Sequence, residues 1–267
     1  MQNRDNYITS PVLQTQEKIL LSIFNKEQAI VIFDIGACEG ESSIRYARLY
    51  PNAEIYAFEP LPSNFELVNK HILQYHATNI HPFQLCLSDK EGTQEFYVSS
   101  GKPEHAGGEN WDYGNKSSSL LPPAMTAEVH PWLKFETAII VQTATLHAFC
   151  LDKLIPGIDF IHMDVQGAEL MVLKGGQDFM QQINCIWLEV EAVELYRDQP
   201  LKNDIEAFMK ANGFIKLEDT VYTHAGDQFW ARKTFIVQQK GQFYIYSRTL
   251  FFTLKSIYKK IRRRFFK

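Results

Sequence analysis

The sequence predicts an α/β protein whose core is a mostly parallel β-sheet with helices on both faces. Residues 31–35 form a short apolar run that ends at the turn from Gly36 to Gly40, which suits a strand buried on both faces. A polar helical run leads from this turn to a second apolar strand, residues 54–58, which is followed by Glu59. Strand, helix and strand in this order form a βαβ unit, which is half of a nucleotide-binding sheet.

The glycine turn distinguishes between two kinds of cofactor. Gly36 and Gly40 let the backbone approach a ligand closely, and Glu59 lies where an acidic residue usually binds ribose hydroxyls. The turn lacks the middle glycine of a dinucleotide motif, and Glu39 and Glu41 occupy the region that a diphosphate would need. These acids favour S-adenosylmethionine, which carries a sulfonium and an ammonium group and no phosphate. A glycine turn in another kind of α/β protein is the alternative.

Further acids follow other predicted strands. Asp89 comes after residues 82–87 and Asp164 after residues 158–163, and the carboxyl ends of parallel strands share one edge of a sheet. We expect Asp89 to accept the adenine amino hydrogen, although the same residues also suit a plain turn. The predicted cofactor ligands are Asp34, Gly36, Glu39, Gly40, Ser42, Glu59, Ser88 and Asp89.

The chain divides into three parts. Residues 1–29 are predicted as a frayed arm and a covering helix, residues 30–238 as the main domain, and residues 239–267 as a basic aromatic tail. The further predicted strands are residues 82–87, 93–99, 138–145, 158–164, 183–190, 214–222 and 228–238. The predicted helices are residues 10–25, 63–72, 149–154 and 203–212, with two more that begin near Glu41 and Glu169.

Residues 92–145 are predicted to be an inserted strand and a substrate loop. Residues 100–135 are rich in Gly, Ser and Pro and contain Trp111, Tyr113 and Trp132. A loop of this length in a compact domain is usually functional or disordered. Aromatic faces cover sugar rings and hydroxyls anchor them, so we predict a binding lid in which Ser117, Ser118 and Ser119 contact the substrate.

The predicted motifs resemble the FkbM-type family of S-adenosylmethionine-dependent methyltransferases over residues 30–237. The segments that carry the resemblance are residues 33–37, 57–60, 87–92, 117–120, 160–175, 188–196 and 213–214. The resemblance implies a Rossmann-like class I methyltransferase fold with a seven-stranded sheet. It also implies a hydroxyl acceptor on a sugar of a glycan, a glycolipid or a related metabolite. Cys38, Gln166 and His147 replace the Asn, Glu and Asp that are commoner in the family.

Methyl transfer to a sugar hydroxyl requires alignment and a base, because the hydroxyl has a high pKa. We predict Asp164 as the base or a metal-linked positioning residue and His162 as the second candidate, although a core histidine bonded to a neighbouring backbone group is the favoured interpretation of His162. Glu189 and Glu169 are predicted to contact the substrate, with a structural residue on the helix face as the alternative for Glu169. Asp164 and Glu189 could instead hold a divalent cation such as Mg²⁺. A protein that keeps the fold without catalysis, and whose tail binds a membrane or partner, is the alternative function.

Charge and cysteine content bear on the location of the protein. The four cysteines are widely spaced, no signal-peptide pattern begins the chain and no apolar run is long enough to cross a membrane, so we predict a cytoplasmic protein. Residues 241–267 carry eight basic and no acidic side chains, whereas the rest carries 19 basic and 31 acidic ones. Residues 243–267 are predicted to form a basic amphipathic helix on an anionic membrane surface at the inner face. Packing on protein is the alternative; nucleic acid is disfavoured by the acidic body, and the oligomeric state is left open.

Overall fold

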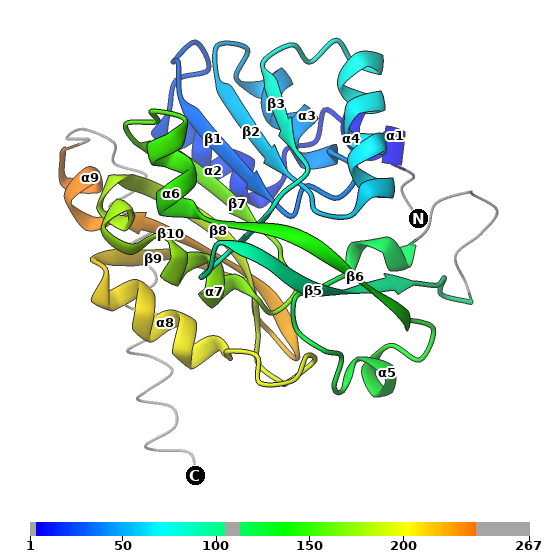
Figure 1. Ribbon diagram of the computed structural model, residues 1–267. Coiled ribbons are helices and arrows are strands. Elements are labelled where there is room, and N and C mark those ends of the chain that lie inside the picture. The colour runs from blue at the N-terminus through cyan, green and yellow to red at the C-terminus, as the bar shows by residue number, and fades with distance from the viewer. Residues whose placement is uncertain (1–3, 105–112, 239–267) are drawn as a thin grey trace.

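A seven-stranded sheet forms the centre of the protein (Figure 1). The computed structural model describes residues 4–104 and 113–238. All strands are parallel except β10, which is antiparallel to both of its neighbours. In spatial order the strands are β3 (Ile80–Phe83), β2 (Glu54–Phe58), β1 (Val31–Ile35), β7 (Ile158–Met163), β8 (Ile183–Glu191), β10 (Ala225–Arg232) and β9 (Phe214–Asp219). The predicted Rossmann-like, mostly parallel sheet of seven strands is confirmed.

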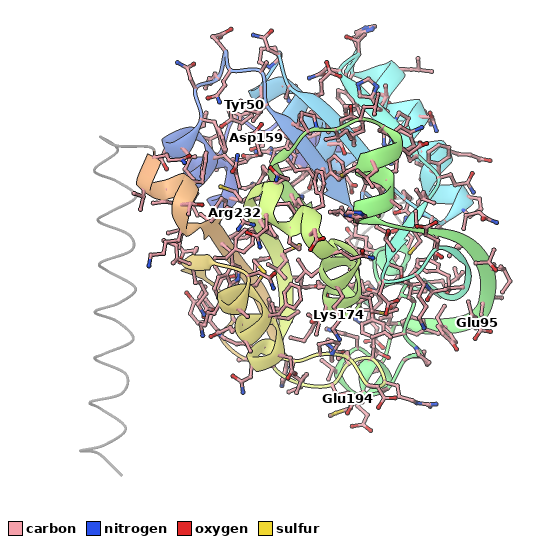
Figure 2. The ribbon with its side chains drawn as sticks, turned by 60° about the vertical axis from the view of Figure 1, so that its left-hand side comes forward. Tyr50, Glu95, Asp159, Lys174, Glu194 and Arg232 are labelled. Atoms are coloured by element: carbon pink, nitrogen blue, oxygen red, sulfur yellow. The ribbon has the colours of Figure 1, made fainter. Side chains whose placement is uncertain are left out.

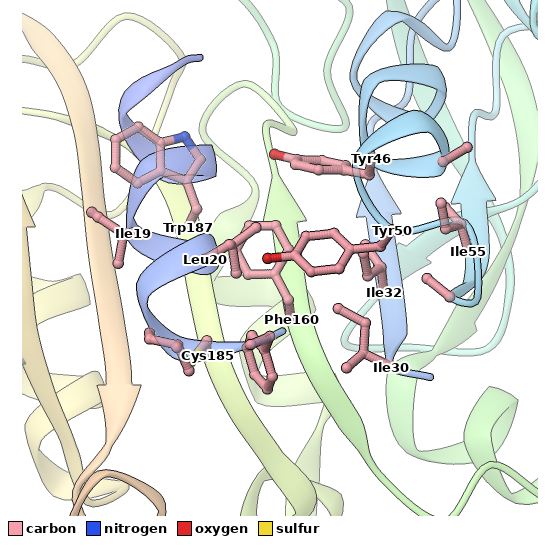
Figure 3. Close-up of a cluster of buried hydrophobic side chains, with 14 of the residues drawn as sticks. Ile19, Leu20, Ile30, Ile32, Tyr46, Tyr50, Ile55, Phe160, Cys185 and Trp187 are labelled. Carbon is pink, nitrogen blue, oxygen red and sulfur yellow. The ribbon is translucent and has the colours of Figure 1, made fainter. Parts of the chain in front are cut away.

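Helices cover both faces because apolar side chains point to both sides of the sheet. One face is covered by α2 (Thr15–Ile23), α3 (Glu41–Leu49) and α4 (Pro62–Gln74). The other face is covered by α6 (Leu146–Asp152), α7 (Glu169–Gly175) and α8 (Lys202–Ala211). Figure 3 shows Leu20 of α2 and Tyr46 of α3 packed over Ile32 and Phe160 of the strands, all of them buried.

A second, three-stranded sheet lies beside the carboxyl edge of the first. It consists of β4 (Cys86–Ser88), β6 (Lys134–Thr145) and β5 (Gly92–Ser100) in the order β4-β6-β5. The single strand predicted at residues 82–87 is therefore wrong, because β3 pairs with β2 and β4 pairs with β6. An apolar run does not say which sheet each part of it will join.

The N-terminal segment is more ordered than predicted. Residues 4–9 form helix α1 (Arg4–Thr9) instead of a frayed arm, and α2 begins at Thr15 instead of near Ser10. Buried Arg45 explains this, because its guanidinium donates to the carbonyl groups of Tyr7 and Val12 and binds the Glu17 carboxylate at 2.6 Å. These bonds hold the segment between the two helices in an extended path.

Two other boundaries differ from the prediction. Helix α4 begins at Pro62, where a missing N–H costs nothing, so Ser63 is not its capping residue. Strand β10 ends at Arg232, and residues 233–238 form α9 (Lys233–Gln238). The remaining short elements are η1 (Tyr113–Lys116), α5 (Thr126–Val129) and η2 (Gln177–Gln182). The tail, residues 239–267, and Trp111 lie outside the described residues.

Two charged side chains, Asp159 of β7 and Arg232 of β10, lie at the amino edge of the sheet; both are labelled in Figure 2. Asp159 accepts hydrogen bonds from the Val31 N–H and the Asn184 amide, both at 3.0 Å. Arg232 donates to the carbonyl groups of Ile183 and Met180. These structural bonds occupy the amino edge. In open α/β sheets, ligands bind at the opposite edge, where the carboxyl ends of the strands lie. Within the described ranges, no helix is both long enough and apolar enough to cross a bilayer.

Candidate functional site

A pocket of about 520 Å³ lies between the carboxyl ends of β1, β2 and β7 and the three-stranded sheet. The lining residues are Ile35, Gly36, Cys38, Phe58, Glu59, Pro60, Leu85, Cys86, Leu87, Phe96, Asn115, Lys116, Ser118, Leu120, Asp164, Val165 and Ala168.

The glycine turn joins three strand ends at this pocket. The N–H groups of Gly36 and Ala37 both donate to the Phe58 carbonyl of β2, at 3.0 and 2.9 Å. Gly36 has a φ of +82°, and a Cβ atom there would lie 1.9 Å from the carbonyl oxygen of Asp164 after β7. Only glycine allows this approach, so the turn brings Asp164 to the same pocket as the β2 end.

Glu59 lies at the end of β2 with its carboxylate held by the backbone. Its two oxygens accept from the N–H groups of Cys38 at 2.9 Å and Leu61 at 2.8 Å. Burial raises the pKa of Glu59 to about 8, although both backbone bonds act to lower it. A carboxylate offers about four lone-pair sites, so Glu59 retains the capacity to accept ribose hydroxyl hydrogens. The apolar side chains of Phe58 and Leu87 suit a purine ring, and the pocket therefore fits the predicted cofactor.

Asp34 does not line the pocket, contrary to the prediction. Its carboxylate accepts from Ser43 Oγ at 2.5 Å and lies 3.3 Å from His162 Nδ1. Neighbouring residues of a strand point to opposite faces, and Ile35 is the one that reaches the pocket. His162 pairs with Asp34 in register, so it shares the face of Asp34 and its ring edge meets Tyr46 of α3. Burial lowers the pKa of His162, but contact with Asp34 raises it above the usual value overall.

The other predicted cofactor ligands support the pocket from outside its lining. Glu39 is buried and binds Arg4 Nη1 at 2.7 Å and Asn115 Nδ2 at 3.0 Å. Gly40 packs against Val68 of α4. Gly36 and Glu59 are the two of the eight predicted cofactor ligands that line the pocket. Ser42 contacts Tyr7, Ser88 is buried and accepts from Gln94, and Asp89 is half-buried beside Ser88.

Residues 113–120, here called the strap, cross the pocket between the two sheets. Asn115 bonds to Asn64 and Glu39, and Lys116 Nζ lies 2.5 Å from Glu41 Oε1. Both Asn115 and Lys116 line the pocket. The sequence placed a lid in this segment but did not identify these two residues, since their partners lie 51 to 76 residues away in the chain.

The three predicted substrate serines belong to the strap and have different roles. Ser118 lines the pocket and accepts from the Ser99 N–H at 3.0 Å. Ser119 is buried and donates to the Gln166 carbonyl at 2.7 Å. The Ser117 carbonyl lies 2.8 Å from the Tyr196 hydroxyl. Ser119 therefore fastens the strap to Gln166 after β7, Ser117 fastens it to Tyr196 after β8, and Ser118 is the serine that faces the pocket.

A pair of carboxylates lies beside the pocket, bridged by one amide. Gln166 Nε2 donates to Asp164 Oδ1 and to Glu189 Oε2, both at 2.6 Å, while the Tyr196 hydroxyl lies 2.9 Å from Gln166 Oε1. Gln166 has a left-handed backbone, with φ of +55°. The amide thus holds Asp164, at the pocket, next to Glu189 of β8.

Three more acids surround this pair, and burial raises the pKa of each. The pKa of Glu191 is raised to about 7 and that of Asp227 to about 6, with the charge of Asp164 as the second cause in both. Burial and Asp164 also raise the pKa of Glu189 well above its usual value. Glu169 accepts from the Val165 and Gly167 N–H groups, so it closes its own turn, and its pKa is likewise raised by burial. This group of acids can hold and release protons near neutral pH.

The structure adds little to the prediction of a magnesium ion. In residues 4–104 and 113–238, no group of three or more His, Cys, Asp or Glu side chains is arranged to hold a metal. The predicted ligands Asp164 and Glu189 are bridged by Gln166 instead. Metal dependence therefore stays a prediction.

Comparison with known proteins gives a consistent result. The sequence model described as "Methyltransferase FkbM domain" matches residues 34–216. The chain is 29% identical over 184 residues to the 2-O-methyltransferase NoeI of Sinorhizobium fredii, covering 68% of this chain and 72% of that protein. It is 26% identical over 211 residues to Methyltransferase sdnD of Sordaria araneosa, covering 74% and 78%. The structure of methyltransferase FkbM from Methylobacillus flagellatus KT aligns with a TM-score of 0.43 and 13% identity, covering 86% of this chain and 50% of that one.

Proposed function

Because the chain belongs to the FkbM methyltransferase family, we propose that it transfers the methyl group of S-adenosylmethionine to a hydroxyl group of a sugar. Family membership makes the protein a methyltransferase. The finer proposal is that the acceptor is a sugar of a glycan, a glycolipid or a related metabolite. It is supported by the similarity to a relative named as a 2-O-methyltransferase.

One observation carries the proposal: Asp164 lines the pocket and also shares the Gln166 amide with Glu189. A carboxylate at the pocket wall is a suitable base for a hydroxyl group. The neighbouring acids have pKa values raised to about 6 and 7, so they can take up the proton at neutral pH.

The residues of the chain divide the work of the reaction. When bound, S-adenosylmethionine supplies a methyl group on a positively charged sulfur, which an oxygen nucleophile displaces in line. Glu59 accepts hydrogen bonds from the ribose hydroxyls, and Phe58 and Leu87 hold the purine. Asp164 removes the proton of the acceptor hydroxyl as the new bond forms, and Gln166 fixes the direction of its carboxylate. Alignment supplies most of the rate, and the base adds about 10²- to 10⁴-fold.

The test begins with calorimetric titration of S-adenosylmethionine and S-adenosylhomocysteine. We expect micromolar binding by the intact chain and strong weakening by Glu59→Ala. Because Ala leaves the N–H groups of Cys38 and Leu61 unpaired, Glu59→Gln serves as a second variant that keeps a bond to one of them. Sugars and glycan fragments are then screened with a labelled methyl donor. A folded protein that binds neither ligand would contradict the proposal and favour the non-catalytic alternative.

The predicted location is a separate proposal. We propose that the protein is cytoplasmic and that residues 243–267 contact anionic lipid at the inner membrane face, because residues 241–267 carry eight basic and no acidic side chains. The full chain should sediment with vesicles that contain phosphatidylglycerol and not with neutral phosphatidylcholine vesicles. Equal binding to both, or to neither, would contradict it.

A further inference from the structure

We propose that Lys116 binds the carboxylate of the methionine portion of the cofactor, an inference that rests on the proposed function. Lys116 comes from the strap and lines the pocket together with Gly36 and Glu59. Among the lining side chains that the structure describes, it is the one with a permanent positive charge. The ligand class is an α-amino-acid carboxylate attached to a nucleoside.

The charges around the pocket explain why a cation is needed there. S-adenosylmethionine carries one anionic group, its carboxylate, and the turn that receives it is surrounded by Glu39, Glu41 and Glu59. All three of these acids are buried. A carboxylate next to them would be repelled unless a cation lay between, because like charges at short range in a protein cost free energy.

Lys116 is held in place for this role. Its Nζ lies 2.5 Å from Glu41 Oε1, and the Glu41 side chain is only 7% exposed. Burial lowers the pKa of Lys116, but the charges of Cys38 and Glu41 raise it above its usual value overall, so the ammonium stays charged. Asn115, the preceding residue, is fixed by Glu39 and Asn64. The Lys116 side chain is 36% exposed, so a ligand in the pocket can reach its ammonium group.

A purely structural role for Lys116 makes a different prediction. If its ion pair with Glu41 only fastens the strap, removing either partner should weaken all nucleoside ligands alike. If Lys116 binds the carboxylate, its removal should weaken only ligands that have one. Glu41→Gln removes the same ion pair and keeps the cation, and it is therefore the matched control.

The experiment compares two ligands by calorimetry: S-adenosylhomocysteine and its decarboxylated analogue S-adenosyl-3-thiopropylamine, which keeps the amine. The intact chain should prefer S-adenosylhomocysteine by roughly 10- to 100-fold, as for one charged hydrogen bond. Lys116→Gln should abolish this preference, whereas Lys116→Arg and Glu41→Gln should retain it. Circular dichroism and melting curves establish that each variant is folded.

The failure of this inference is distinguishable from that of the proposed function. A Lys116→Gln protein that keeps the full preference, or that weakens both ligands equally, would overturn the role of Lys116 and leave the cofactor assignment intact. An intact chain that binds neither ligand would overturn the proposed function, and the inference with it.

Discussion

The acidic side chains in the two halves of the carboxyl edge of the sheet have different bonding partners. At the ends of β1 and β2, Glu39 binds Arg4, Glu41 binds Lys116, and Glu59 accepts two backbone N–H groups. At the ends of β7 and β8, the ion pairs of the described residues include none to Asp164 and Glu189, which share the Gln166 amide, or to the neighbouring Glu191.

This difference separates binding from proton transfer. Fixed cations lie beside Glu39 and Glu41, and backbone N–H groups hold Glu59, so these acids can shape a pocket for a ligand of fixed geometry. Glu189 and Glu191 lie near Asp164 without a Lys or Arg partner among the described residues, and burial and the charge of Asp164 raise the pKa of both, that of Glu191 to about 7. The first half of the edge is thus suited to hold the cofactor and the second half to receive the proton of the acceptor.

The largest effect should come from Asp164→Asn. The amide keeps the shape and contacts of the side chain but cannot take a proton, so kcat should fall by about 10²- to 10⁴-fold. The affinity for S-adenosylhomocysteine should change only a few-fold. Steady-state kinetics with an acceptor found in the sugar screen, together with calorimetry, measures both. An Asp164→Asn protein with nearly normal kcat would show that a different acid near Asp164 is the base.

The pH dependence of cofactor binding should be the next largest effect. Ribose hydroxyls donate to ionised Glu59, whose pKa in the free protein is about 8, so binding below that pH must release a proton. Affinity for S-adenosylhomocysteine should therefore fall as the pH is lowered, by roughly 20-fold from pH 8.5 to 6.5 if Glu59 is ionised in the complex. Calorimetry across this range measures it.

Glu59→Gln is the control for this pH dependence, because it cannot titrate. It should bind more weakly at every pH, and its affinity should change little with pH. A slope that persists in the variant would assign the proton to a different group.

Gln166→Glu should have a smaller effect on the other half of the edge. A third carboxylate beside Asp164 and Glu189 cannot share the site in ionised form, so it raises the pKa values of the group. The acid limb of the kcat/KM profile should move up by about one pH unit, with roughly a tenfold loss below it. Gln166→Met, which loses the bonds without adding charge, should lower kcat at every pH and move the limb less. An unmoved limb in Gln166→Glu would show that this group does not set the profile.

Much of the fold was predictable because its signals are local. Strands β1 and β2 have the predicted bounds, since strands buried on both faces are continuous apolar runs. Gly36 and Glu59, two of the predicted cofactor ligands, line the pocket, and the sequence could single them out because a turn and a strand end are properties of a few adjacent residues.

Side-chain direction and distant contacts were not predictable in this way. Asp34 lies within β1, two residues before Gly36, yet its side chain faces α3, and the strand alternation that decides this depends on which face the pocket occupies. Lys116 is 75 residues from its partner Glu41 in a segment with no periodicity. Asp227 of β10 lies beside Glu189 because β10 pairs antiparallel with β8. The sequence does not reveal this register.

The smallest expected effect is on stability. It tests whether the buried acids near Asp164 and Glu189 lower the free energy of unfolding. The pKa of Glu191 is raised by burial to about 7, above its unfolded value of about 4.5, so the folded state binds the proton more tightly. This contribution to stability is complete below pH 4.5 and is lost as the pH rises through 7. Glu191→Gln avoids the loss, and its melting temperature relative to the intact chain should rise by a few degrees between pH 5 and pH 8. Exposed Glu66→Gln on α4 is the control and should show no such trend. A flat difference for Glu191→Gln would mean that the cluster is neutralised by a cation, and it would erase the contrast between the two halves of the edge.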